Sequence, residues 1–355
     1  MSDPHALWQQ LQDAGVVSTD MPAESHEQQP AFFLRMLLVA SGWFAALFFI
    51  SFIAAFFTHF LLDESQIWIL GMMLCGLSIG LSHRRGNSVF IQQFIFACSL
   101  AGQGLIIFGI FIHSPNPQLS ALLIIALELL LFVAMGIAHQ RSTSIFIACS
   151  ALVWLLGEQA WLYALPLFSA AALGLWLYRI RLNRYAAYVQ PAATGLTLAL
   201  WLTIALTLVV SSSEVMSWYA TPASWQTQLW IAAGLSSAVC LALAWQLLQS
   251  HVQHQQLRTL AILVSLGVAL LNLKMPGLAP LCLLFCIGVA YAYSRLIWLN
   301  ICCLAGYLML YYYNLNDSLL DKSILLCVSG TVLLALYGVL NRCTQRLTLE
   351  QQHAA

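Results

Sequence analysis

Charged residues are scarce in this chain of 355 residues: they make up 7% of it, whereas apolar residues make up 61%. A water-soluble domain has roughly 25% charged residues, so the composition excludes a soluble fold. Thirteen Lys and Arg residues balance thirteen Asp and Glu residues. The chain therefore lacks the net positive charge that favours nucleic acid, and we expect no nucleic-acid partner.

Lysine is rarer still, because only Lys274 and Lys322 occur. Neither follows a glycine-rich loop, so the sequence has no Walker motif for nucleotide phosphates. Long apolar runs dominate instead, and a helix that spans a bilayer needs about 20 residues. The sequence therefore predicts an all-α, polytopic helix bundle embedded in a lipid bilayer.

Breaks between the apolar runs predict about twelve transmembrane helices, within a range of ten to twelve. Their predicted starts are Met36, Ile67, Val89, Leu119, Ser144, Trp161, Ala192, Gln228, Leu257, Leu278, Leu296 and Leu320. The fifth, which ends near Leu156, and the ninth, which ends near Leu273, are the shortest, so each has a re-entrant segment as its alternative.

The chain divides into three predicted regions: an acidic cytoplasmic tail over residues 1–32, the helix bundle over 33–341 and a cytoplasmic C-terminal tail over 342–355. The first tail has no Lys or Arg before Arg35, unlike a secretory signal peptide, which begins with basic residues.

The distribution of cations predicts the orientation. With the N-terminus in the cytoplasm, all eleven arginines fall inside and both lysines fall outside, which is a strong positive-inside bias. The arginines are Arg35, Arg84, Arg85, Arg141, Arg179, Arg181, Arg184, Arg258, Arg295, Arg342 and Arg346. An even number of helices then places both termini in the cytoplasm.

Ten cysteines and nine histidines raise the possibility of redox or metal chemistry, but no CxxC pair occurs. Nine of the cysteines lie inside predicted helices, where they pack as small apolar residues. We therefore predict no metal site, no cofactor and no catalytic residue, and we do not expect an enzyme.

The most informative residue is Glu128, near the middle of the fourth predicted helix. A charged carboxylate at that depth costs about 2.5 to 3.5 kcal/mol. Its own helix offers only apolar neighbours, so it requires a partner from another helix or remains protonated. Gln103 in the third helix is the predicted partner, because both residues lie about ten positions from the connecting turn. Two alternatives stay open: a carboxyl group that titrates or contacts a substrate, and a neutral one that holds two helices together.

Small residues mark predicted sites of close helix packing. Gly102 and Gly104 flank Gln103, and Gly76 with Gly80 forms a GxxxG pair in the second helix. Glycines let neighbouring backbones approach closely.

Polar and aromatic residues gather on the predicted outer side. A tyrosine cluster precedes two acids and a lysine, and the other external lysine lies in the turn before the tenth helix. The members are Tyr311, Tyr312, Tyr313, Asp317, Asp321, Lys322 and Lys274. We call this set the outer patch. It is either an ion-paired cap at the membrane interface or a docking surface for a partner.

The run GYLMLYYYNLNDSLLDKSILLCVSG over 306–330 resembles the C-terminal signature of a bacterial membrane family known as domain of unknown function 4401. The turn at Pro276 and Gly277 is similar to that family as well. The resemblance implies a multi-pass bacterial inner-membrane protein with no assigned activity. It also implies assembly with neighbours, because family members tend to be encoded beside a second membrane protein and a smaller one named for a Gly-Asp-Tyr motif.

A rival resemblance concerns the turn Leu81 to Asn87, which is similar to the Gly-x-Leu-Ala-Asp-Arg-x-Gly-Arg motif of major-facilitator transporters. Leu81, Arg84 and Gly86 match, but His83 replaces the aspartate. A second copy between the eighth and ninth helices, which a repeated half should show, does not occur.

Two functions follow as hypotheses. The favoured one is a non-enzymatic component of a membrane complex, which binds another membrane protein and a small periplasmic or membrane-anchored protein through the outer patch. The alternative is a secondary transporter that couples solute movement to protonation of Glu128.

Overall fold

The computed structural model describes most of the helical part of the chain. The described residues are Trp8, Gln12, 32–60, 67–83, 88–210, 225–251, 255–314 and Leu320. Their α-helices are α2 (Phe32–Phe60), α3 (Ile67–Ser82), α4 (Val89–His113), α5 (Pro117–Ala134), α6 (Ala138–Ala160), α7 (Ala164–Tyr178), α8 (Ala186–Val210), α10 (Trp225–His251), α11 (Gln255–Lys274), α12 (Leu278–Ala290) and α13 (Ser294–Asn314). Two short 3-10 turns, η2 (Trp161–Tyr163) and η3 (Asn183–Tyr185), come before α7 and α8.

The chain is an all-α, multi-pass membrane protein, but the prediction of twelve spanning helices is wrong. In the described ranges there are eleven α-helices, in the predicted order, and eight of them are long and apolar enough to cross a membrane. The twelfth predicted helix, together with both predicted tails, lies almost entirely outside the described residues.

The short helices are not the ones that the sequence predicts. The fifth and ninth predicted helices correspond to α6 and α11, which have 23 and 20 residues. The shortest are α12, with 13 residues, α7, with 15, and α3, with 16. At 1.5 Å per residue, α12 is about 20 Å long, less than the ~30 Å of a hydrocarbon core. Helix α6 begins at Ala138, before the predicted start at Ser144. Its first turns are polar, and they lower the mean hydropathy of the helix.

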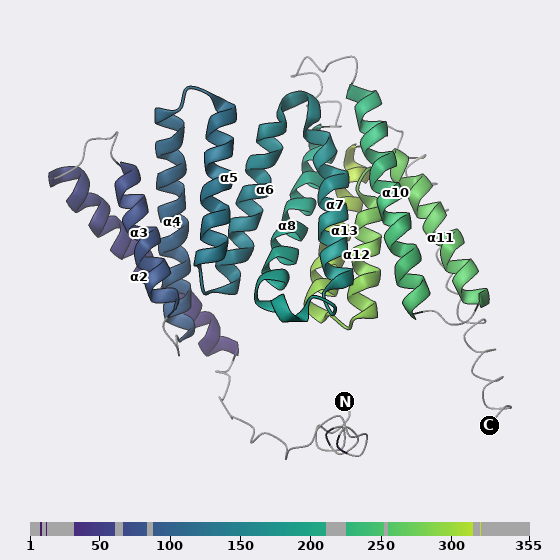
Figure 1. The fold of residues 1–355 in the computed structure, drawn as a ribbon, viewed down its shortest axis with the longest axis horizontal. Coiled ribbons are helices and arrows are strands. Elements are labelled where there is room, and N and C mark those ends of the chain that lie inside the picture. The colour runs from purple at the N-terminus through teal and green to yellow at the C-terminus, as the bar shows by residue number, and fades with distance from the viewer. Residues whose placement is uncertain are drawn as a thin grey trace.

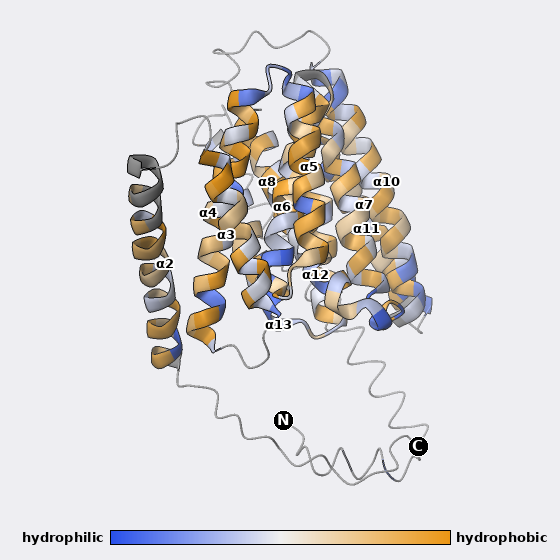
Figure 2. Cartoon of the chain, turned by 60° about the vertical axis from the view of Figure 1, so that its left-hand side comes forward, coloured by the Kyte–Doolittle hydropathy of each residue, from blue (hydrophilic) through white to orange (hydrophobic). Residues whose placement is uncertain are grey.

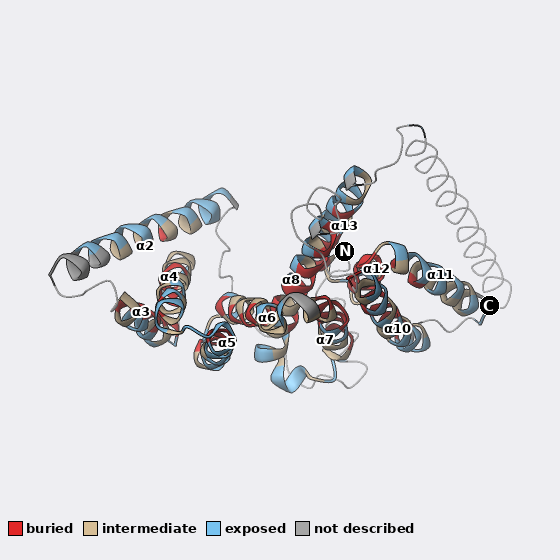
Figure 3. Cartoon of the chain, turned by 90° about the horizontal axis from the view of Figure 1, so that it is seen from above, coloured by how far each residue is buried: buried red, intermediate tan, exposed pale blue. Residues whose placement is uncertain are grey.

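The helices form a curved row instead of a closed ring (Figure 1; Figure 3). Neighbouring pairs along the row are α3 with α4, α5 with α6, α6 with α8, α8 with α7, and α7 with α10. Helix α2 packs mainly on α4, and α12 joins α10 to α13. Seen from above, α2 and α13 project on the same side of the row. The hydrophobic colour covers most of the helix surfaces, and the hydrophilic colour gathers toward their ends (Figure 2).

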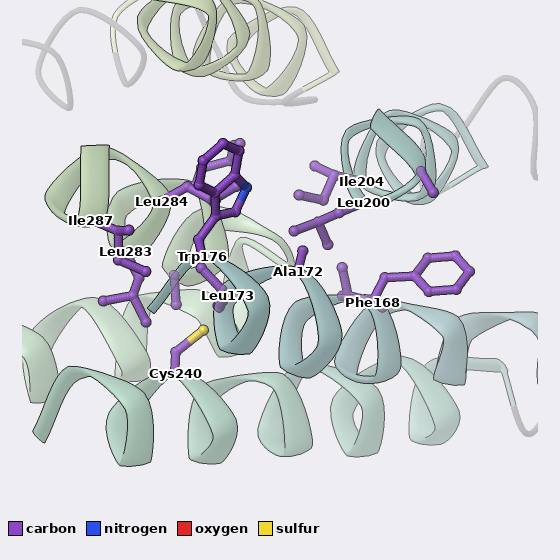
Figure 4. Close-up of a cluster of buried hydrophobic side chains, with 14 of the residues drawn as sticks. Phe168, Ala172, Leu173, Trp176, Leu200, Ile204, Cys240, Leu283, Leu284 and Ile287 are labelled. Atoms are coloured by element: carbon purple, nitrogen blue, oxygen red, sulfur yellow. The ribbon is translucent and has the colours of Figure 1, made fainter. Parts of the chain in front are cut away.

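The larger apolar core lies in the second half of the row (Figure 4). Phe168, Leu173 and Trp176 of α7 are buried against Leu200 of α8 and Leu284 of α12. Many other apolar side chains point outward, as in α2, where Phe33 is 80% exposed. Because the hydrocarbon of a bilayer is as apolar as these side chains, such faces are suited to contact lipid.

One polar residue, Asn272, joins α10, α11 and the turn before α12. Its side chain is completely buried, and Nδ2 donates to the hydroxyls of Ser236 at 2.9 Å and Ser237 at 3.0 Å. Its Oδ1 accepts the backbone N–H groups of Gly277 and Ala279, each at 3.0 Å. A polar group in an apolar interior is costly unless it is hydrogen-bonded, and Asn272 meets this requirement at both ends of its amide.

Gly277, at the start of α12, is a position where a side chain does not fit. Its φ is 100°, in the left-handed region that favours glycine. A Cβ atom there would lie 2.7 Å from Ile204 Cγ2 of α8. The turn before α12 therefore depends on glycine for both conformation and space.

Replacement of Gly277 by alanine should destabilise the protein. Gly277→Ala is expected to lower the free energy of unfolding by about 1 to 3 kcal/mol, from positive-φ strain and overpacking against Ile204. The control is Gly267→Ala in α11, where a Cβ meets nothing within 4 Å and alanine favours the helix. Unfolding in detergent micelles measures both variants, and equal stability of the two would contradict the expectation.

Candidate functional site

The candidate site is built around Glu128 on α5. This helix begins after Asn116, whose side-chain oxygen accepts the Gln118 N–H at 2.9 Å, with Pro117 in the first turn. Glu128 lies eleven residues beyond Pro117 and is completely buried (0% exposed). Ile124 and Leu131 are buried on the same face, at helical spacing. The prediction that Glu128 has only apolar neighbours on its own helix agrees with this arrangement.

Three other helices bring polar groups toward Glu128. The Ser144 hydroxyl of α6 faces the carboxyl group as a weak hydrogen-bond neighbour, and the Cys75 thiol of α3 lies within electrostatic range of it. Gln103 of α4 is also buried, and its Nε2 donates to Ser144 Oγ at 3.5 Å. Gln103 and Glu128 therefore share Ser144 as a neighbour. The Nε2 group of Gln103, the predicted partner of Glu128, donates to Ser144 and not to the carboxyl group.

Close packing of α3 on α4 positions this group of residues. A Cβ atom on Gly71 would lie 2.7 Å from the Gly102 carbonyl oxygen, and one on Gly102 would lie 2.8 Å from Cys75 Sγ. The packing predicted for Gly76 and Gly80 is wrong for the described residues, since a Cβ on either meets nothing within 4 Å. Both lie on the exposed face of α3, opposite the face that packs on α4.

Several buried atoms in this region have no close hydrogen-bond partner among the described residues. They are both carboxylate oxygens of Glu128, Oε1 of Gln103, both side-chain polar atoms of Gln140, and Oγ of Ser99. Gln140 lies on α6 one turn from Ser144. Buried polar atoms are nearly always paired in proteins, and an unpaired one in an apolar interior is costly. We call Gln103, Glu128, Gln140 and Ser144 the polar seam.

No cation neutralises the seam within the described ranges. The nearest arginine in sequence, Arg141, bonds elsewhere: Nε donates to the Met135 carbonyl at 2.7 Å and Nη1 to the Ala187 carbonyl at 2.8 Å. Its guanidinium also lies 4.1 Å from the ring centroid of Tyr188. An ionised Glu128 would therefore carry a buried charge without a counter-ion, which is strongly unfavourable.

The predicted outer patch is only partly described. Lys274 ends α11, and the tyrosine cluster ends α13, where Tyr313 is 80% exposed. The hydroxyl of Tyr307, one turn before Tyr311, donates to the Pro276 carbonyl at 3.2 Å, so the turn after Lys274 contacts α13. Asp317, Asp321 and Lys322 lie outside the described residues.

Residues 31–343 match the family model described as domain of unknown function, DUF4401. The chain belongs to the DUF4401 family. Comparison of this DUF4401 chain with curated proteins and with solved structures finds no match. The polar seam falls inside the matched range, but the family supplies no activity for it.

Sequence reasoning about the DUF4401 chain missed Ser144 and Gln140 as members of the seam and Asn272 as a hub. The apolar pattern predicts that a helix starts at Ser144, which places Gln140 in the preceding loop. The available signal was their spacing of four residues, which places both on one face of a helix.

Leucine substitutions distinguish the seam from the hub. Asn272→Leu is expected to lower the free energy of unfolding by about 2 to 4 kcal/mol, because it leaves two hydroxyls and two backbone N–H groups without their partner. Glu128→Leu removes no close hydrogen bond among the described residues, only the weak contact with Ser144, and is expected to leave stability unchanged or to raise it by about 1 to 3 kcal/mol. Unfolding in detergent measures both. A loss at Glu128 equal to that at Asn272 would show that Glu128 holds the helices together.

Proposed function

We propose that this DUF4401 protein is a proton-coupled secondary transporter in which the Glu128 carboxyl group takes up and releases the proton. The supporting observation is that Glu128 is completely buried among polar side chains from other helices, with the Ser144 hydroxyl as a weak hydrogen-bond neighbour and no close hydrogen bond to either carboxyl oxygen among the described residues. A residue that only tied helices together would be expected to hold bonds, as Asn272 does. The proposed role involves no covalent step, so we propose no enzymatic activity.

The composition of the polar seam suits a group that changes its protonation state. Among its unpaired atoms, Oε1 of Gln103 and Oε1 of Gln140 are acceptors. A protonated carboxyl group has an O–H to donate, whereas an ionised one accepts only. Protonation therefore allows Glu128 to bond to an acceptor, and loss of the proton leaves an uncompensated charge. The two states favour different packing of α4, α5 and α6, which is what coupling requires.

We further propose that the protein lies in a bacterial inner membrane with both termini in the cytoplasm. The arginines support this orientation, because Arg141, Arg258 and Arg295 lie near the starts of α6, α11 and α13, and Arg179 to Arg184 connect α7 to α8. The α5–α6 turn and the α7–α8 connection both lie at the lower ends of the helices in Figure 1. Lys274 lies at the end of α11, one helix length away from Arg258.

Reporter fusions test the orientation. Green fluorescent protein fused after Asn183 should fluoresce, and alkaline phosphatase fused there should be inactive, because the α7–α8 connection is proposed to be cytoplasmic. Fusions after Met275 should give the opposite pair of signals. The reverse pattern at both sites would contradict the proposed orientation.

The proton-binding role is tested with Glu128→Gln, which keeps the size of the side chain but cannot titrate. In vesicles containing the native protein, infrared spectra should show a protonated carboxylic acid band that disappears on alkalinisation, together with release of about one proton per chain. Glu128→Gln should lack both signals, and Glu158→Gln at the end of α6 should keep them. Absence of the band from the native protein would contradict the proposal.

A second candidate function is a non-enzymatic component of a membrane complex with another membrane protein and a small periplasmic or membrane-anchored protein. The observation that favours it is the open row of helices, in which α2 and α13 project on one side and the aromatic end of α13 is exposed (Figure 3). A chain that assembles with others does not need to close its own bundle.

Native mass measurement of the gently extracted protein tests the second candidate. A stable complex of different chains is expected, and it should be lost when Asp317 and Asp321 are replaced by lysine and Lys322 by glutamate. The control is Arg258→Gln, which lies at the other end of the helices. A lone chain or a homo-oligomer from the native membrane would overturn this candidate.

A further inference from the structure

A second polar feature lies at the ends of the helices that carry the arginines, away from Glu128. A cavity of about 350 Å³ opens where α7 ends, α12 ends and α13 begins. Its lining includes Trp176, Arg179, Asn183, Tyr291 and Tyr293, with apolar wall residues beside them. We call it the Arg179 cavity.

The cavity holds its arginine against aromatic rings. The Arg179 guanidinium carbon lies 4.3 Å from the ring centroid of Tyr293 and 5.7 Å from that of Trp176. The two rings pack edge to face, with centroids 5.1 Å apart. Stacking uses the face of a guanidinium and leaves its N–H edge free to bind carboxylate or phosphate. Arg179 is thus positioned to present donors to an anion.

The turn between α12 and α13 fixes the two tyrosines that line the cavity. Ala292 has φ 52°, the Tyr293 N–H donates to the Gly288 carbonyl at 2.8 Å, and the Ala292 N–H to that of Val289 at 3.1 Å. This pair of bonds is a Schellman motif with alanine at the position that usually holds glycine. The Tyr291 hydroxyl also donates to the Leu177 carbonyl at 3.2 Å, which attaches this turn to α7.

The protein provides no acid close in sequence to neutralise this arginine. Between residues 65 and 213 the only acids are Glu128 and Glu158. Glu128 lies within α5, and Glu158 is at the end of α6 that leads into α7, a full helix length from Arg179. Arg181 and Arg184 follow Arg179 directly, so positive charge accumulates beside the cavity.

One wall of the cavity is apolar and reaches the outer surface of the helices. Ile287 and Leu296 are buried in it, and Ile180 is 70% exposed. A small soluble anion would gain no favourable contact from such an apolar wall. A phospholipid matches both parts, since its phosphate bears negative charge and its acyl chains run along an apolar surface. Basic pockets between membrane helices on the cytoplasmic side bind anionic headgroups.

We infer that the Arg179 cavity binds the phosphate headgroup of an anionic membrane phospholipid, with Arg179 as the charged donor and Trp176, Tyr291 and Tyr293 as its aromatic frame. The acyl chains lie along the exposed Ile180. This site is independent of the function proposed for Glu128, because none of its residues belongs to the polar seam.

The test uses the full chain purified in a neutral detergent and titrated with phosphatidylglycerol or phosphatidylcholine, with bound lipid counted by native mass spectrometry. The native protein should retain one phosphatidylglycerol in preference to phosphatidylcholine. Arg179→Gln should weaken that binding by about fivefold or more, and Arg258→Gln, a matched loss of charge outside the cavity, should not. Arg179→Lys keeps the charge but loses the planar stacking, so it should fall between the native protein and Arg179→Gln.

Three outcomes would overturn the inference. They are equal retention of the two lipids, equal loss in the Arg179 and Arg258 variants, and displacement of phosphatidylglycerol by inorganic phosphate alone, which would indicate a soluble anion as the occupant. Thermal unfolding of each variant shows whether lost binding reflects lost structure. If Arg179→Gln does not fold, the comparison of Arg179→Lys with native protein decides, and equal affinity there overturns the inference.

Discussion

Within the hydrocarbon of a membrane, a buried polar atom must find its hydrogen-bond partner inside the protein, since no water is available to supply one. Asn272 meets this requirement on both sides of its amide and thereby fixes α10, α11 and the glycine turn before α12. Glu128 is equally buried, but its carboxyl oxygens have no close hydrogen bond within the described residues, with Ser144 as a weak neighbour. The same constraint thus makes Asn272 a structural hub and is the reason for proposing Glu128 as the group that binds the proton.

The two halves of the row differ in what lies between their helices. From α6 onward the interior is a large apolar core, and several of its isolated polar residues, such as Thr197 with Trp176, are paired. Between α3 and α6 the apolar clusters are small, and the polar seam lies on α4, α5 and α6. The α3–α4 pair and the α5–α6 pair each pack closely, but α4 contacts α5 and α6 only slightly. The proposed change in protonation of Glu128 would therefore act next to the weak contact between the two pairs, where rearrangement costs least.

The sequence was sufficient to predict the class of fold, the order of the helices and the depth of Glu128, because long apolar runs and one intramembrane acid are visible without a structure. It did not predict helix lengths well. The polar first turns of α6 are helical because Gln140 and Ser144 face inward, and hydropathy alone assigns such residues to loops. The sequence pattern also indicated the wrong glycines on α3, Gly76 and Gly80, because a GxxxG spacing does not reveal which helix face meets a neighbour. The glycine of α3 that contacts α4 is Gly71.

The first turn of α8 connects the two sites. Arg141, which follows Gln140 of the polar seam, bonds to the carbonyl of Ala187 and stacks on Tyr188. The same turn directly follows the connection that carries Arg179, Arg181 and Arg184. Aromatic rings hold both Arg141 and Arg179, and within the described ranges neither arginine has an acidic partner. Backbone carbonyls complete the contacts of Arg141, whereas stacking leaves the N–H edge of Arg179 for the lipid phosphate that we infer.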